Sequence, residues 1–191
     1  CKSMAKGYSA SLNFPDEQVT HAQSFCCISV TAFWRAICKR NDAQLPVKSH
    51  SFMLAPLPAD VIHIAESVGE IVSRFPIEQA GYLIGSIYTV MLPSSVRSTL
   101  GAYYTPPSLV THLLKQAEAA GFNFSTGSAI DPACGGGAFL IPLALKMIQS
   151  DEGQSAIWTL TRLKRQLKGI EIDPFAAWIS SVLLEASLLP L

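Results

Sequence analysis

Apolar residues recur every three or four positions through much of the first half of the chain. This spacing predicts three helices, at 21–40, 59–74 and 77–91. Several prolines between residues 46 and 58 predict a loop, and the polar segment 93–99 is predicted to be a linker. The longest apolar stretch lies inside the third helix and is shorter than the roughly 20 residues of a membrane-spanning helix. We therefore predict a buried helix there, and no membrane segment.

Short apolar runs alternate with helical patterns in the second half. Strands are predicted at 128–130 and 167–172, and helices at 107–120, 138–148, 155–166 and 175–189. Strands joined by a right-handed crossover helix run parallel, so the pattern predicts the start of a doubly wound, Rossmann-like α/β sheet. The chain is therefore divided into a helical amino-terminal region, 1–96, and an α/β region, 97–191. With two strands, the sheet is expected to leave an unpaired edge and exposed apolar helix faces.

A glycine turn follows the first predicted strand, in the segment Asp-Pro-Ala-Cys-Gly-Gly-Gly at 131–137. Glycine lacks a Cβ and tolerates positive φ, so Gly135 and Gly137 allow a ligand to approach the backbone at the start of the next helix. The carboxylate of Asp131 would repel a phosphate but would pair with an amino group. The dinucleotide fingerprint also requires a glycine where Leu140 stands and an acid about 20 residues later. The turn therefore favours an amino acid-like, cationic ligand over NAD.

A second carboxylate, Glu171, lies near the end of the second predicted strand. If the two strands are neighbours, Glu171 lies beside the glycine turn, where a carboxylate can accept both hydroxyls of a ribose. On its own, a glutamate in this position is as easily a solvated charge. Together, Asp131, the turn and Glu171 predict a pocket for a nucleoside joined to an amino acid, which describes S-adenosylmethionine.

A third motif, Tyr-Tyr-Thr-Pro-Pro at 103–107, precedes the helix predicted at 107–120. Thr105 is predicted to cap that helix and Pro107 to occupy its first turn. The order of this motif, the glycine turn and Gly-Ile-Glu-Ile-Asp-Pro at 169–174 closely resembles the amino-terminal half of the catalytic domain of adenine-N6 DNA methyltransferases from bacterial restriction-modification and phage-defence systems. The resemblance covers residues from about 97 to 191.

The resemblance implies S-adenosylmethionine as cofactor and a role for each matching residue. By this resemblance, Tyr103 and Thr105 lie against the methionine end, Asp131 and Ala133 hold the amino acid moiety, Gly135 and Gly137 permit close approach, Glu171 takes the ribose hydroxyls and Ile172 packs on the adenine. The family often has serine where this chain has Gly136, and this difference is expected mainly to make the turn more flexible.

The family's catalytic motif, Asp or Asn followed by Pro-Pro and an aromatic residue, does not occur in the sequence. Adenine methylation needs it to hold a flipped base against the cofactor, so we assign no catalytic residue and expect no activity from this chain alone. The first residue is Cys1, which suggests a fragment of a longer protein. For the full-length protein, the resemblance implies DNA as substrate and a restriction endonuclease or a specificity region as partner.

Several alternatives stay open at this stage. The acceptor could be cytosine N4, RNA or protein, because the acceptor motif is absent. The chain could also be an inert truncated remnant or a structural module, or, more remotely, part of a nucleotide-dependent oxidoreductase.

Composition predicts a cytoplasmic protein, and the chain has no excess of positive charge for binding DNA. The chain has 14 basic and 14 acidic residues, 49% hydrophobic residues and a mean hydropathy of +0.31. One basic cluster, formed by Arg162, Lys164, Arg165 and Lys168, is predicted to be a solvated helix face. The five cysteines lack Cys-x-x-Cys spacing and are predicted to be buried free thiols, Cys134 among them as a packing residue. The four histidines lack metal-ligand spacing, so no metal site is predicted.

Overall fold

The computed structural model describes residues 2–151 and 153–191, and most of them are helical. The helices of the first half are α1 (Lys2–Ala10), α2 (Pro15–Arg40), α3 (Ala59–Val72), α4 (Ile77–Met91) and α5 (Ser94–Leu100). The second half contains α6 (Pro107–Ala119), β1 (Ala129–Asp131), α7 (Leu140–Gln149), α8 (Ala156–Gln166), β2 (Leu167–Gly169) and α9 (Pro174–Leu188).

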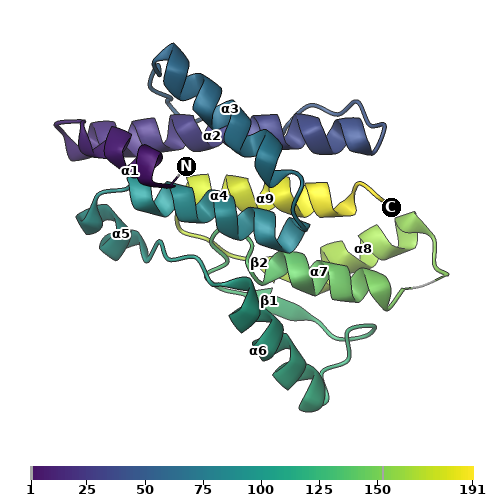
Figure 1. Cartoon of the computed structure of the whole chain (residues 1–191). Helices are drawn as coiled ribbons and strands as arrows, with labels where there is room; N and C mark the ends of the chain where they lie inside the picture. The colour runs from purple at the N-terminus through teal and green to yellow at the C-terminus, as the bar shows by residue number, and fades with distance from the viewer. Residues whose placement is uncertain (1, 152) are drawn as a thin grey trace.

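The larger hydrophobic core joins the two halves of the chain. Helix α9 packs against α2, α4 and α7 (Figure 1). Phe175 and Ile179 of α9 are fully buried there with Phe33 of α2 and Ile84 of α4. Helix α4 is buried as predicted, and no described helix is long and apolar enough to cross a membrane. The larger core is therefore shared by both halves, and a smaller core around Val110 and Met147 lies within the second half. The boundary near residue 96 stays a prediction.

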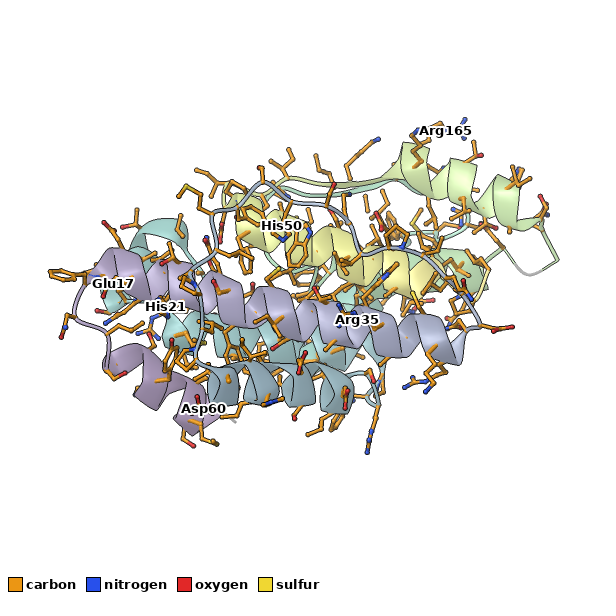
Figure 2. The ribbon with its side chains drawn as sticks, turned by 90° about the horizontal axis from the view of Figure 1, so that it is seen from above. Glu17, His21, Arg35, His50, Asp60 and Arg165 are labelled. Atoms are coloured by element: carbon orange, nitrogen blue, oxygen red, sulfur yellow. The ribbon has the colours of Figure 1, made fainter. Side chains whose placement is uncertain are left out.

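The segment between α2 and α3 lies over α9 (Figure 2). The indole Nε1 of Trp178 donates a hydrogen bond to the carbonyl of Lys48 at 2.9 Å. His50, labelled on this segment in Figure 2, stacks on Phe52, and its Nε2 lies 3.2 Å from the Cys27 thiol. The loop predicted from the prolines is therefore a cover for the core.

The sheet of the described residues consists of two parallel strands of three residues. Ala129 pairs with Leu167 and Asp131 with Gly169, so the predicted parallel pairing is confirmed. The predicted Rossmann-like sheet is not shown, because β2 ends at Gly169 instead of residue 172 and no further strand joins the pair in the described part of the chain. Ile130 is 62% exposed, so β1 is not a fully buried strand.

Three local predictions were wrong. The segment 93–99 is not a linker, because α5 forms there and ends at Gly101 in the left-handed conformation (φ 59°). Thr105 does not cap α6, whose N-cap residue is Pro106 and has no side-chain cap hydrogen bond. Helix α2 begins at Pro15, six residues earlier than predicted, with proline and two acidic residues in its first turn.

Arg162 does not belong to a solvated basic face. Its side chain is buried, and its guanidinium lies 2.8 Å from Oδ1 of Asp151. It also donates to the backbone carbonyls of Phe124, Ser125 and Met147. Arg162 therefore ties α8 to the end of α7 and to the loop before β1, whereas Lys164, Arg165 and Lys168 are exposed.

Four cysteines are buried free thiols, as predicted: Cys26, Cys27, Cys38 and Cys134. Cys1 lies outside the described residues. Burial raises the pKa of Cys134, so its thiol stays protonated and suits packing rather than nucleophilic chemistry. Within the described ranges, no group of three His, Cys, Asp or Glu side chains is arranged to hold a metal ion.

Candidate ligand-binding site

Backbone hydrogen bonds extend the contact between the strands into the glycine turn. The N–H of Ile170 donates to the carbonyl of Asp131, and the N–H of Cys134 donates to the carbonyl of Ile170, both at 2.9 Å. Gly135 and Gly137 have φ values of 50° and 88°, which explains the need for glycine at these positions. The turn is thereby held at the carboxyl end of the sheet and at the amino end of α7.

Both predicted carboxylates lie at this turn. Oδ1 of Asp131 accepts the N–H of Ala133 at 3.2 Å. Glu171 is half-buried, and its two oxygens accept the N–H groups of Gly135 at 2.7 Å and Asp173 at 2.9 Å. Glu171 is therefore not a simple solvated charge, because it fixes the glycine turn against the segment that follows β2.

A cavity of about 560 Å³ opens at this turn. Seven of the eight residues predicted from the sequence line it: Tyr103, Thr105, Asp131, Ala133, Gly135, Glu171 and Ile172. The eighth, Gly137, lies behind the turn, where an added Cβ would come within 2.9 Å of the Ser180 hydroxyl. The structure therefore brings together residues from three separate sequence motifs.

All the charged side chains that line the cavity are acidic. Three carboxylates, those of Asp131, Glu171 and Asp173, are among its lining residues, and none of the described lining residues is Lys, Arg or His. Tyr103 and Ile172 are 68% and 82% exposed, so an aromatic ring and an apolar side chain of the lining are open to a ligand. Such a cavity favours a cationic ligand with a flat apolar part and disfavours phosphates.

Comparison with known proteins identifies the family of the chain. A family model described as N-6 DNA Methylase matches residues 79–183, which is 105 of the 191 residues. The chain belongs to the N-6 DNA methylase family. No curated protein matches the chain, and no solved structure matches it. The match to the N-6 DNA methylase family begins inside α4 and ends inside α9, so it includes every residue of the cavity.

Sequence analysis missed a buried polar pair at the floor of this N-6 DNA methylase cavity. The Tyr88 hydroxyl of α4 donates to Oδ2 of Asp173 at 3.2 Å. Oδ1 of Asp173 accepts the N–H of Phe175 and caps α9. The aspartate followed by Pro174 is a sequence signal for this cap. Nothing in the sequence pairs Tyr88 with it, since 85 residues separate them.

Gly136 has a different role from the flexibility predicted for it. Its φ is not positive, and a Cβ there would overlap the ring of Tyr104. A Cβ at Gly85 of α4 would overlap the same ring. The ring of Tyr104 therefore fits only because residues 85 and 136 are glycine, and we call this space the slot for Tyr104. A serine at position 136 would not leave room for the ring.

The buried carboxyl of Asp173 should make the stability of the fold depend on pH. Burial raises the pKa of its carboxyl above the usual 3.8. Between the usual and the raised pKa, the folded state keeps a proton that the unfolded state has lost, so rising pH destabilises the fold across this window. Urea unfolding of wild type and Asp173→Asn at a series of pH values should show wild type losing stability relative to the variant from about pH 3.8 upward. A constant difference would contradict the prediction.

Proposed function

We propose that this chain binds S-adenosylmethionine as the donor-binding part of a DNA methyltransferase that methylates adenine N6. The observation that carries the proposal is the cavity at the glycine turn, with three carboxylates and no cationic side chain in its described lining. Members of the N-6 DNA methylase family use S-adenosylmethionine in general, which supports this choice of cofactor.

The charges of S-adenosylmethionine complement this lining. The cofactor carries an ammonium and a sulfonium cation, and both are stabilised near carboxylates. A dinucleotide would bring two phosphate charges into the same space and would be repelled. The oxidoreductase alternative therefore has no support from the cavity.

Each predicted residue has a role in this proposal. Asp131 pairs with the ammonium group, Ala133 holds the amino acid moiety and Gly135 lets the turn approach it. Gly137, behind the turn, allows the turn its left-handed conformation. Thr105 lies against the methionine end. Glu171 accepts the ribose hydroxyls. Its oxygens already accept backbone N–H groups, but each carboxylate oxygen has a second lone pair for a further donor. Tyr103 contacts the methionine end, and the exposed face of Ile172 packs on the adenine.

We assign no residue of this chain to binding the adenine that accepts the methyl group. Residues 1–191 contain no Asp or Asn followed by Pro-Pro and an aromatic residue. We therefore expect this chain to bind the cofactor and to transfer no methyl group to DNA on its own. In the full-length protein, DNA is the proposed substrate, and restriction-modification or phage defence is the proposed setting. Labelled methyl transfer to DNA by the purified chain would contradict the expected inactivity.

Calorimetric titration with S-adenosylhomocysteine tests the donor site. Wild type should bind, and Asp131→Ala and Glu171→Gln should each weaken binding about tenfold to a hundredfold, because a hydrogen bond to a charged group contributes about 1.5–3 kcal/mol. The matched controls are Glu17→Ala and Asp60→Ala, which remove exposed acids on α2 and α3 (Figure 2). Binding of NADH in place of S-adenosylhomocysteine, or no binding by the folded wild type, would overturn the proposal.

A further inference from the structure

A continuous series of hydrogen bonds runs from helix α4 to the glycine turn. The Tyr88 hydroxyl donates to Oδ2 of Asp173 at 3.2 Å, and the backbone N–H of Asp173 donates to Oε1 of Glu171 at 2.9 Å. The other oxygen of Glu171 accepts the N–H of Gly135 at 2.7 Å. The series therefore connects a buried hydroxyl of α4 with the carboxylate that is proposed to accept the ribose hydroxyls.

Tyr88 and Asp173 are both held firmly in place. Tyr88 is 1% exposed, and its ring centroid lies 4.9 Å from that of Phe175. Burial raises the pKa of the Tyr88 phenol, so its hydroxyl remains a neutral donor. Oδ1 of Asp173 accepts the N–H of Phe175 and caps α9, so the carboxylate cannot turn away from Tyr88 without losing this cap. Asp173 is therefore fixed from two sides, by α4 and by the start of α9.

Glu171 needs such support because packing does little to hold the segment around it. Strand β2 ends at Gly169 and α9 begins at Pro174, so Glu171 lies in a connection without regular structure. Its neighbours Ile170 and Ile172 are 56% and 82% exposed. Hydrogen bonds weaken steeply when distance or angle departs from the optimum. The position of Glu171 relative to a ligand therefore depends on the hydrogen bonds at the two ends of this connection.

We propose that Tyr88 is a positioning residue for cofactor binding, which acts through Asp173 to hold Glu171 where its carboxylate meets the ribose hydroxyls. This inference rests on the proposed function, because it requires a ligand whose ribose lies at Glu171. It also gives helix α4 a role beyond the core: a hydroxyl of this helix sets the affinity of a site that is formed by the segments after β1 and β2.

Calorimetric titration of the full chain with S-adenosylhomocysteine tests this role. Tyr88→Phe keeps the ring against Phe175 and removes only the hydroxyl that donates to Asp173. Ile84→Val is the control for a general loss of stability. Ile84 lies one turn earlier on the same buried face of α4 and does not line the cavity, so this substitution loosens the core and breaks no hydrogen bond of the series.

Both substitutions should lower the Tm, but only Tyr88→Phe should weaken binding, by about threefold to tenfold. In the background of Glu171→Gln, which removes the charged acceptor, Tyr88→Phe should weaken binding by less than about twofold, because the two residues act through the same hydrogen bonds. Unchanged affinity in Tyr88→Phe, an equal loss in Ile84→Val, or the same loss with and without Glu171→Gln would each overturn the inference while leaving the donor site intact. No binding of S-adenosylhomocysteine by folded wild type would overturn the proposed function, and the inference with it.

Discussion

Arg162→Ala should lower the free energy of unfolding by about 3–5 kcal/mol, the usual cost of breaking a buried ion pair from one side. The substitution leaves the buried carboxylate of Asp151 without its cation and removes the donor to three backbone carbonyls. Urea unfolding followed by circular dichroism measures the change. The size of the loss reflects the burial of Arg162, of which only 5% is exposed.

Two comparisons make the Arg162 prediction specific. Arg165→Ala removes an exposed arginine that projects from the same helix (Figure 2) and should change stability by less than about 0.5 kcal/mol. The double variant Arg162→Leu/Asp151→Leu should lose less than Arg162→Ala, because no buried charge remains unpaired. Equal losses for Arg162→Ala and Arg165→Ala would contradict the structure of this ion pair.

Gly69→Ala should destabilise the fold by about 1–3 kcal/mol, although alanine is the better helix former. Helices α2 and α3 approach so closely at Gly69 that a Cβ would overlap the backbone carbonyl oxygen of Ser29 and lie 2.8 Å from the Cβ of Ala32. Backbone atoms cannot move aside as a flexible side chain can, so the helices must separate. Thermal or urea unfolding measures the loss.

Gly7→Ala is the matched control for this packing effect. Gly7 lies inside α1, and a Cβ there would meet nothing within 4 Å. Alanine should therefore stabilise the chain by up to about 1 kcal/mol through helix propensity alone. The two glycine substitutions are expected to have opposite signs, and the same sign for both would show that the α2–α3 contact is not as close as described.

The sequence predicted helices well where apolar periodicity and proline act together. The helix predicted at 77–91 is α4 with the same bounds, because Pro76 precedes it and its apolar face is continuous. The helix α5 escaped prediction, since Ser94–Leu100 is short and mostly polar and none of its residues is buried. The apolar run at 167–172 suggested a longer strand than β2, but its last residues turn away to form the site.

Apart from the family resemblance, the sequence predicted only those residues of the candidate site that follow the ends of the two strands. Asp131 and Glu171 could be paired from the sequence because parallel neighbouring strands end at the same edge of a sheet. Tyr88 reaches the cavity from α4 and Gly85 lies against the ring of Tyr104, and both positions depend on how α4 packs against the rest of the chain. Sequence patterns do not encode such packing, so the floor of the cavity and the slot for Tyr104 became visible only in three dimensions.

The slot for Tyr104 limits how the chain can be recombined with its relatives. A glycine turn grafted from a family member with serine at position 136 would collide with the tyrosine ring, and so would an α4 with any side chain at position 85. Residues 85, 104 and 136 must therefore be exchanged together, although they come from three separate segments. A chimera that preserves all three should accept foreign sequence elsewhere in α4 more readily than one that divides them.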